Sequence, residues 1–454
     1  MKKCVRLLLA VLLTASLTAG DAVANQKTAA SIAAEPSTYD TVPLKDVDGR
    51  TIILRGANFM AVEANGQPID YERMTEWGFN VVRILMTWAA LEPEQGAYDE
   101  NYLPNVIEPQ VTYAHDAGLL VIIDFHQFNW SACCGGMGMP EWICGDLPQM
   151  ELEWLFQSGF FWGNQDYLDA FVAAWAKVAE FFTGDDRIFA YDLFNEPHDS
   201  LLTLPWTFEN PFLRPLYVEL IETIRAIHPD PYIVIEPSIV HGAGVFPFVM
   251  DPLPYERLIY SPHLYPGFTA VGGGYVFKKE LIARQIDRMR KEAAEQGVPL
   301  WIGETGLGSS KYRADLYARD ATDLMEDAMA HWTWWAFGYD DDSMGLCDAS
   351  GQPKEEFFPY LSRPYPRTTA GNLHYFHFDV ETRVFTTAFH NAEDQAPMME
   401  IFVNQDYHYP EGFAVSSSDT DGTWSYSFDE STEILTVNFD PQTTAHALTI
   451  EPAK

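Results

Sequence analysis

Short apolar runs alternate with stretches of helical period along most of this chain, and this alternation limits the possible folds more than any other feature. Strands that are buried on both faces read as continuous apolar segments. Eight such runs separated by helices fit a closed parallel barrel better than an open sheet. We therefore expect an α/β fold, a (β/α)8 TIM barrel, with strands at Ile52–Ala57, Phe79–Leu85, Leu119–Phe125, Ile188–Phe194, Tyr232–Glu236, Leu258–Ser261, Leu300–Glu304 and Trp332–Phe337.

The stretches between these runs have the period of amphipathic helices. Apolar residues recur there at spacings of three and four, which places them on one face of a helix. We expect helices at Tyr102–Ala117, Tyr167–Phe182, Leu213–Ile227, Leu281–Gln296 and Ala314–Met329.

The pattern changes after residue 366. From Arg367 to Lys454 no long helical period survives, and short β-type runs are separated by Asn, Asp, Gly and Pro. This is typical of a small antiparallel β-sandwich. The predicted division is a barrel over 41–366 and a C-terminal β-sandwich over 367–454. Its expected strands are Tyr375–Asp379, Val384–His390, Met399–Val403, Thr423–Phe428 and Ile434–Phe439.

The N-terminal segment has the composition of a secretory signal. Three basic residues precede the apolar run Leu7–Leu13, and Ala22-Val23-Ala24 provides a small-x-small cleavage site. The uncharged stretch is shorter than the roughly 20 residues that a membrane-spanning helix needs. We expect a signal peptide over 1–24, a flexible lead-in over 25–40, and a protein that is secreted or periplasmic.

Acidic residues outnumber basic ones, and the formal net charge is −37. Such a surface repels the phosphates of nucleic acids and anionic membranes. We expect no nucleic acid partner, and we expect a monomer.

Four cysteines remain beyond the signal: Cys133, Cys134, Cys144 and Cys347. In an oxidising compartment they can form two disulfides. Adjacent cysteines pair only with strain, so we expect Cys133 and Cys134 to bond Cys144 and Cys347 in either order. Zinc is the alternative, but the spacing is not that of two short Cys-x-x-Cys clips.

Two glutamates stand where predicted strands end. Glu196, in Asn195-Glu196-Pro197, ends the fourth strand, because Pro197 cannot donate to a sheet ladder. Glu304 ends the seventh strand between two glycines that let a ligand approach closely. Catalytic residues of a β/α barrel come from these strand ends. Either glutamate alone could cap a turn or form an ordinary ion pair.

Together the two glutamates predict a retaining glycosidase, in which the carboxyl groups flank the glycosidic bond about 5–5.5 Å apart. One carboxyl must donate a proton and the other must stay ionised as the nucleophile, so their surroundings must differ.

Other strand ends supply side chains that suit this chemistry. Arg83 can keep the nucleophile ionised through charge-assisted hydrogen bonds. Asn195 can donate to a sugar 2-hydroxyl, and Trp335 offers a flat apolar face to a sugar ring. Any one of these residues could be an ordinary core residue, but their common position at one end of the barrel favours a site. The candidate site residues around the two glutamates are Arg83, His126, Asn195, His263, Tyr265 and Trp335.

These residues and the segments around them resemble glycoside hydrolase family 5, and within it the bacterial endoglycoceramidases. The resemblance implies Glu196 as acid/base, Glu304 as nucleophile, and the other six residues as the shell of the site. It implies cleavage of the β-linkage between sugar and ceramide of glycosphingolipids, without a metal or cofactor. It also allows transient contact with lipid micelles or membranes. The similar segments are Asp48–Asn58, Tyr191–Pro197, Tyr260–Pro266 and Arg363–Gly371.

Two positions depart from the pattern of the endoglycoceramidases. The loop Phe59–Gly66 has no lysine where those enzymes place one against the sugar, and Phe128 stands where they have an aspartate. Both changes remove polar contacts to the glycan, and buried hydrogen-bond partners discriminate strongly between substrates. Alternative substrates are therefore other β-glucosides: glucosylceramide, a sterol glucoside or a polysaccharide. A non-catalytic glycan- or lipid-binding protein is the alternative outside enzymes.

A long insertion, residues 128–162, follows the third strand and contains 11 Phe, Trp and Met residues in 35 positions. Met and aromatic residues make adaptable apolar surfaces. The insertion predicts a lid that packs on the barrel, an apolar groove for a lipid tail, or both.

Overall fold

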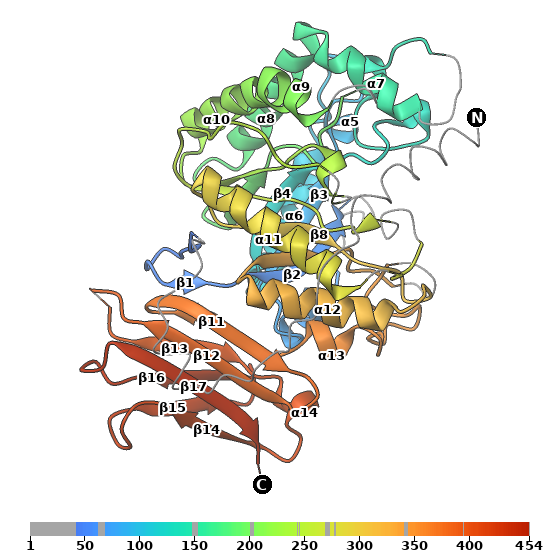
Figure 1. Ribbon diagram of the computed structural model, residues 1–454. Coiled ribbons are helices and arrows are strands. Elements are labelled where there is room, and N and C mark those ends of the chain that lie inside the picture. The colour runs from blue at the N-terminus through green and yellow to red at the C-terminus, as the bar shows by residue number, and fades with distance from the viewer. Residues whose placement is uncertain are drawn as a thin grey trace.

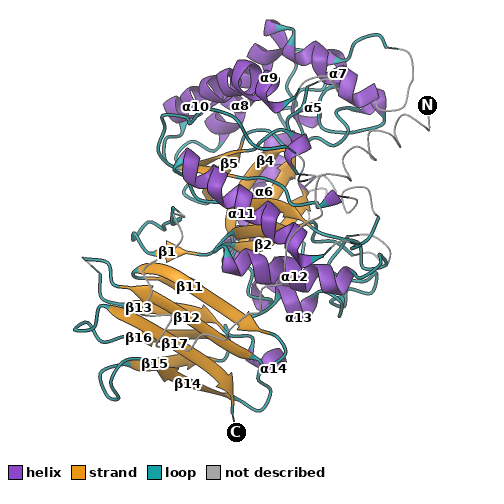
Figure 2. Ribbon diagram, in the orientation of Figure 1, coloured by secondary structure: helices purple, strands orange, loops and turns teal. Residues whose placement is uncertain are grey.

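The computed structural model contains a helix-covered barrel and, beside it, a region built of strands (Figure 1; Figure 2). The predicted signal peptide and lead-in lie outside the described residues, as does most of the loop after the first barrel strand. The structure describes residues 42–61, 69–147, 153–199, 204–242, 244, 246–267, 273–276, 278–339, 344–393 and 395–453.

Within the described residues, eight parallel strands form the barrel in the order β7-β6-β5-β4-β3-β2-β9-β8. The ring closes between β7 and β8: Tyr260 N–H donates to the Pro299 carbonyl (3.0 Å) and Leu264 N–H to the Glu304 carbonyl (2.8 Å). The predicted TIM barrel is thus confirmed. Its strands are β2 Arg55–Met60, β3 Val81–Met86, β4 Leu120–Phe125, β5 Ile188–Asp192, β6 Tyr232–Ile235, β7 Leu258–Tyr260, β8 Trp301–Thr305 and β9 His331–Trp334.

Helices cover the outside of the barrel, and the five predicted ones all form (Figure 2). In α10 the buried residues recur every three or four positions, so one apolar stripe faces the strands. No helix in the described ranges is both long and apolar enough to span a membrane. The helices are α4 Tyr71–Glu76, α5 Trp88–Leu91, η1 Leu103–Ile107, α6 Glu108–Asp116, η2 Ala132–Cys134, η3 Glu141–Ile143, α7 Glu153–Trp162, α8 Gln165–Phe181, α9 Pro205–Phe208, η4 Glu209–Leu213, α10 Arg214–Ile227, η5 Ile239–His241, α11 Lys279–Gln296, α12 Ala314–Asp327 and α13 Phe358–Leu361.

The C-terminal region contains the expected antiparallel sheets, in the orders β1-β10-β13-β16-β15 and β11-β12-β17-β14. The first barrel strand was expected to begin at Ile52, but Thr51–Ile52 forms a separate strand, β1. It pairs instead with Thr368–Thr369, and the barrel strand begins at Arg55. The other elements are β10 Tyr365–Thr369, β11 Asn372–Asp379, β12 Val384–His390, β13 Met398–Phe402, α14 Gln405–His408, β14 Phe413–Ser417, β15 Ser425–Asp429, β16 Ile434–Asn438 and β17 Ala445–Pro452.

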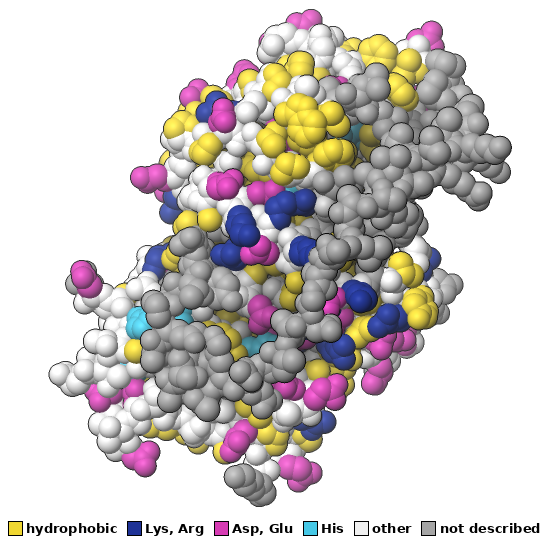
Figure 3. Space-filling view, viewed as in Figure 1, with side chains coloured by type: hydrophobic (Ala, Val, Ile, Leu, Met, Phe, Trp, Pro, Cys, Tyr) yellow, Lys and Arg dark blue, Asp and Glu magenta, His cyan; other side chains and the backbone are white. Residues whose placement is uncertain are grey.

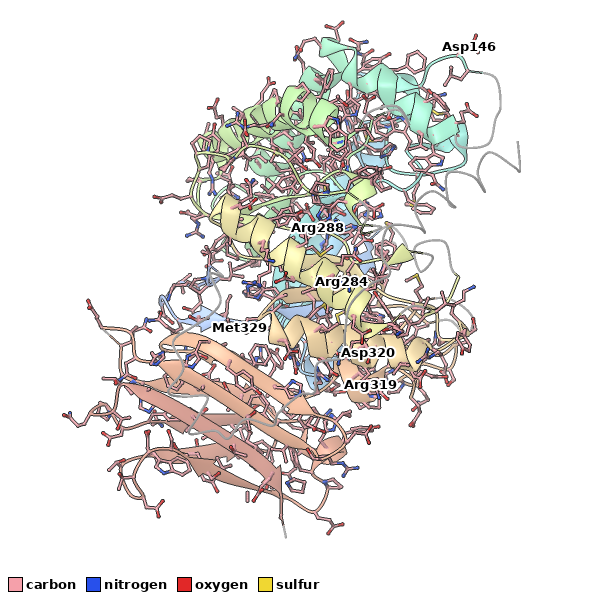
Figure 4. All side chains as sticks on the ribbon, viewed as in Figure 1. Asp146, Arg284, Arg288, Arg319, Asp320 and Met329 are labelled. Atoms are coloured by element: carbon pink, nitrogen blue, oxygen red, sulfur yellow. A yellow bond between two sulfur atoms is a disulfide. The ribbon has the colours of Figure 1, made fainter. Side chains whose placement is uncertain are left out.

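The sandwich packs against the N-terminal ends of the barrel strands. The ring of Phe402 fills the space beside Gly78, where an added Cβ would meet it at 2.3 Å. Met329, at the end of α12, packs on the core of the sandwich (Figure 4). Because the sandwich covers this end, the carboxyl ends of the barrel strands stay free for a site.

One disulfide forms among the described cysteines, between Cys133 and Cys144, which is one of the expected pairings. The expected second disulfide is wrong, because Cys134 and Cys347 carry free thiols. The Cys134 thiol donates to the Asn129 carbonyl (3.2 Å) in the loop after β4, whereas buried Cys347 follows β9. Strands β3 and β2 lie between these two strands in the barrel, and this separates the two thiols.

Candidate active site

Glu196 and Glu304 meet at the C-terminal end of the barrel, Glu196 just after β5 and Glu304 within β8. A carboxylate oxygen of each and a ring nitrogen of His263 all lie within 4.8 Å of one another. This approach fits the separation of about 5–5.5 Å between the carboxyl groups of retaining glycosidases, and not the roughly 6.5–9.5 Å of inverting ones.

Arg83, fully buried in β3, connects the groups of the site. Its Nη1 donates to Oε1 of Glu304 (3.0 Å) and to Oδ1 of Asn58 (3.2 Å), and its Nη2 donates to Oδ1 of Asn195 (2.9 Å). A buried charge is tolerated only when it is paired and hydrogen-bonded. Arg83 therefore provides the fixed positive charge that was expected beside Glu304.

Three buried carboxylates that sequence reasoning missed also face Arg83. Its side chain lies 3.0 Å from Asp124, 2.9 Å from Asp192 and 2.9 Å from Glu236. Their oxygens are close enough together to be metal ligands, but the guanidinium lies against all three. Burial raises the pKa of Asp124 to about 8 and that of Asp192 well above its ordinary value.

A sequence signal for Glu236 existed. Glu236 follows an apolar strand and precedes Pro237, in the same pattern as Asn195-Glu196-Pro197. Asp124 and Asp192 gave a weaker signal, because a single carboxylate inside an apolar run shows no spacing that points to a partner.

His263 lies between three glutamates. Its Nδ1 is 2.9 Å from Oε1 of Glu196 and 3.5 Å from Oε2 of Glu304, and its Nε2 is 3.3 Å from Oε1 of Glu236. Burial lowers the pKa of His263, but the charges of Glu236 and Glu304 outweigh it and hold the pKa well above its usual value. The facing carboxylates therefore favour the protonated form of His263.

The two central glutamates are shifted in opposite directions. Burial raises the pKa of Glu196, but the hydrogen bond and the charge of His263 outweigh it, so the pKa is below its ordinary value. Burial raises the pKa of Glu304, and the charges of His263 and Arg83 oppose this only in part. These directions are the reverse of those expected for a proton donor at Glu196 and an ionised nucleophile at Glu304. The ring nitrogen Nδ1 of His263, 2.9 Å from Glu196, is close enough to exchange a proton with it.

The backbone of Glu196 is held in an unusual conformation. Its φ is +45°, in the left-handed region that residues other than glycine rarely adopt. Its N–H donates to Oε2 of Glu236 (2.7 Å), and its carbonyl accepts from Nε2 of Gln127 (3.1 Å). Strained conformations of this kind persist where the surroundings over-determine them, and they cluster at functional sites. Glu236 and Gln127 thus both position the backbone of Glu196, and neither of them was identified from the sequence.

The remaining candidate residues lie around this centre. Nδ1 of His126 is 2.9 Å from Asp124, burial lowers the pKa of His126 to about 4, and its ring stacks on Trp335 with centroids 5.2 Å apart. The hydroxyl of Tyr265 donates to Oε2 of Glu304 (3.2 Å). One N–H of the Asn195 side-chain amide donates to the Gln127 carbonyl (2.9 Å), so the second can donate to a ligand.

The structure thus brings all eight candidate site residues to one end of the barrel. Their assignment as acid/base, nucleophile and sugar-binding shell remains a prediction.

Gly303, next to Glu304, leaves room for its neighbours. A Cβ at this position would lie 2.4 Å from Oγ of Ser261 and 3.3 Å from Nε2 of His263. Any larger residue would therefore force the Ser261 hydroxyl to move and press on the imidazole that faces the glutamates.

The aromatic insertion after β4 divides into two sets. Four of its large side chains are buried on the barrel, as expected of a lid: Trp130, Met139, Phe161 and Trp162. Trp142 and Trp154 are half-buried against the same core. Phe128, Phe156 and Phe160 are exposed, and Phe128 is the most open at 58%. The predicted lipid groove therefore depends on this second set.

Comparison with known families and structures agrees with this geometry. The profile described as Cellulase (glycosyl hydrolase family 5) matches residues 46–341. A second profile, the glycoside hydrolase family 5 C-terminal domain, matches residues 363–451.

Several relatives that match over most of the chain are endoglycoceramidases. Endoglycoceramidase I of Rhodococcus hoagii is 28% identical over 424 residues, which cover 83% of this chain and 81% of that protein. Endoglycoceramidase of Hydra vulgaris is 25% identical over 76% of this chain and 73% of its own length. The solved structure of endo-glycoceramidase II from Rhodococcus sp. as a lactosyl-enzyme intermediate has a TM-score of 0.76 at 25% identity, covering 91% of this chain and 100% of that one. The present chain therefore belongs to glycoside hydrolase family 5 and is a glycoside hydrolase.

Proposed function

We propose that this protein hydrolyses the β-linkage between the sugar and the ceramide of glycosphingolipids, with retention of anomeric configuration. The observation that carries the proposal is its similarity to endoglycoceramidases over most of the chain, with both family 5 domains present. The close approach of Glu196 to Glu304 supports retention.

In the first step, the Glu304 carboxylate attacks the anomeric carbon and the bond to the ceramide oxygen breaks. Nδ1 of His263 passes its proton to Glu196, and Glu196 passes it on to that oxygen, which leaves Glu196 as a carboxylate and His263 neutral. Arg83 and Tyr265 donate to Glu304 and keep its oxygens directed at the sugar. A lactosyl-enzyme intermediate of the Rhodococcus sp. enzyme supports a covalent route of this kind.

In the second step, Glu196 takes a proton from water as that water attacks the anomeric carbon, and this proton returns to Nδ1 of His263. The sugar leaves as a free oligosaccharide, and Glu304 returns to its ionised form.

Exposed apolar side chains support a lipid-linked substrate. Phe128 stands two residues after His126, and Trp206 in α9 is 53% exposed with its ring packed edge-on against Phe246 (6.2 Å between centroids). Apolar side chains gather over the region of α9 and α10 (Figure 3). Large exposed apolar patches mark protein or membrane contact sites. The net charge of −37 favours a neutral over an anionic lipid surface.

A substrate panel tests the proposal. Lactosylceramide, a longer ganglioside, glucosylceramide, a sterol glucoside and cellulose fragments are incubated with the protein, and the products are separated. We expect intact ceramide and a free oligosaccharide from the longer glycolipids, with the released sugar in the β configuration by NMR. Faster turnover of cellulose fragments, or an inverted product, would contradict the proposal.

A second candidate is hydrolysis of glucosylceramide or another simple β-glucoside. The observation in its favour is Phe128, an exposed apolar residue beside the site that cannot bond a second sugar. A preference for glucosylceramide over lactosylceramide in the same panel would select this candidate.

We also propose that the protein is exported, on the signal-like composition of residues 1–24. The Cys133–Cys144 disulfide is compatible with an oxidising compartment. N-terminal sequencing of protein recovered outside the cytoplasm should begin after Ala24, and an intact N-terminus would contradict export.

A further inference from the structure

Glu236 is a buried carboxylate at the end of β6 to which the proposed reaction gives no role. It is 1% exposed, so a sugar in the site cannot contact it in this conformation. Its own backbone is clamped by Tyr217 of α10, whose hydroxyl donates to the Glu236 carbonyl (2.9 Å) and accepts from its N–H (3.2 Å). The backbone of Glu236 is therefore fixed, and its carboxylate lies against Glu196 and His263.

The two oxygens of Glu236 serve different neighbours. Oε2 accepts the N–H of Glu196 at 2.7 Å and so holds that residue in its left-handed conformation. Oε1 accepts from Arg83 (2.9 Å) and lies 3.3 Å from Nε2 of His263, out of line for a well-formed hydrogen bond. The contact with His263 therefore acts mainly through charge.

That charge decides how firmly His263 keeps its proton. Among the charged neighbours that raise the pKa of His263, Glu236 has the largest effect and Glu304 the next largest. The titratable and charged groups around His263 are Glu196 after β5, Glu236 after β6, Glu304 in β8, Arg83 in β3, Asp124 in β4, Tyr265 in its own loop and His241 in η5.

We propose that Glu236 is a positioning residue that aims Glu196 through its backbone N–H and keeps a proton on the Glu196–His263 pair. The inference rests on the proposed role of Glu196 as acid/base, but it does not depend on the identity of the lipid. Because His263 and Glu196 share one proton across 2.9 Å, they titrate as a unit, and a negative neighbour strengthens their hold on it.

The test uses the pH dependence of kcat/KM on a soluble aryl β-lactoside with a poor leaving group. Glu236→Gln removes the charge and keeps an oxygen that can accept from Glu196 N–H. We expect the basic limb of the pH profile of kcat/KM to move to lower pH by about one unit. Without the negative charge of Glu236, the Glu196–His263 pair loses its proton more easily. Glu236→Asp keeps the charge but moves it, so we expect a lower kcat with the basic limb retained.

Tyr217→Phe is the matched control, since it loosens the backbone of Glu236 and leaves the charge in place. We expect lower thermal stability and an unmoved basic limb. An unmoved limb in folded Glu236→Gln, or an equal movement in Tyr217→Phe, overturns the proposal.

A measurement on the unmodified protein covers the case in which Glu236→Gln does not fold. We expect the imidazole of His263 to carry protons on both nitrogens at pH 7 by ¹⁵N NMR, with a His263→Gln spectrum for assignment. A neutral ring at that pH together with an ionised Glu196, read from its ¹³C carboxyl shift, overturns the proposal. Loss of glycolipid cleavage with retained aryl lactoside turnover would instead count against the proposed substrate alone.

Discussion

At the residue scale, the site is organised around one guanidinium. Arg83 is shared by Glu304, Asn195, Asp192 and Glu236, which come from three different strands. A planar donor of this kind can bond several carboxylates in fixed directions, which an ammonium group cannot do. The orientation of the proposed nucleophile is therefore coupled to that of the residues around the proposed acid.

The roles of the two glutamates should be distinguishable with substrates whose leaving groups differ in their need for a proton. General acid catalysis contributes about 10²–10⁴-fold. We expect Glu196→Ala to lose about that factor on a ceramide-linked substrate and much less on a nitrophenyl lactoside, whose leaving group needs no proton. Glu304→Ala should lose activity by orders of magnitude on both. Glu295→Gln, at an exposed position of α11, is the control. Steady-state kinetics decide, and wild-type-like turnover of the ceramide-linked substrate by either alanine variant would reject the assignment.

A buried histidine should make the protein sensitive to acid. Nδ1 of His331 accepts the N–H of Leu54 (3.1 Å), and burial lowers the pKa of His331 from 6.5 to about 3. Between these values the unfolded chain binds a proton that the folded chain does not, so stability falls as pH falls. We expect the free energy of unfolding to decrease from pH 6.5 downwards in denaturant titrations.

His331→Asn keeps an acceptor for Leu54 and removes the titration. We expect its unfolding free energy to depend less steeply on pH below 6.5. The slope should not vanish, because burial also lowers the pKa of His126 and of His408, each to about 4. An unchanged slope would show that His331 is not the group responsible.

At the element scale, the insertion after β4 combines a packed layer with a few open aromatic rings. The Cys133–Cys144 disulfide closes a short loop, and Trp130 packs against Phe161 with ring centroids 5.7 Å apart. Phe128 and Phe160 face outward from this rigid base. Exposed rings on a stapled segment are preorganised for an apolar ligand, because ordering costs are already met.

The exposed rings should matter only for lipid-linked substrates. Burying a Phe side chain is worth about 1.5–3 kcal/mol. We expect Phe128→Ser with Phe160→Ser to lower kcat/KM on glycosphingolipid vesicles roughly tenfold or more. Turnover of a soluble aryl lactoside should hardly change. Tyr426→Ser, which removes a 49% exposed ring from the sandwich, is the control. Equal losses on both substrates would dismiss the groove.

At the scale of the whole molecule, barrel and sandwich share a buried ion cluster. Glu326 of α12 accepts from Arg363 (2.9 Å) and Arg55, and its second oxygen accepts the N–H of Phe378 in β11 (3.1 Å). Arg55 also lies over the ring of Tyr365, 4.2 Å from its centroid. Arg319 and Asp320 lie nearer the N-terminal end of the same α12 (Figure 4). One carboxylate thus contacts the first barrel strand and the sandwich.

Breaking this cluster should destabilise both parts together. Removing one partner of a buried ion pair costs about 3–5 kcal/mol, because it leaves an uncompensated charge. We expect Glu326→Ala to lower the unfolding free energy by about that amount, with barrel and sandwich melting in one calorimetric transition. Glu295→Gln should change it by no more than about 0.5 kcal/mol. Two separate transitions would show that the parts fold independently.

The sequence alone determined the barrel, the sandwich and the pair Glu196 and Glu304. These follow from local patterns: continuous apolar strands, helical periods, and carboxylates where strands stop. Parallel strands then place all their carboxyl ends at one mouth, so even residues far apart in the chain could be assigned to one site.

Only the tertiary structure decided the contacts between distant segments. Thr51–Ile52 has the composition of a barrel strand, but its partner is β10, more than 300 residues away in the chain. Cys134 and Cys347 remain thiols because the barrel separates their loops. Glu236 gains its place because Arg83, His263 and Glu196 converge on it from other strands. Hydrogen-bond partners and pKa shifts depend on such convergence, which no local pattern records.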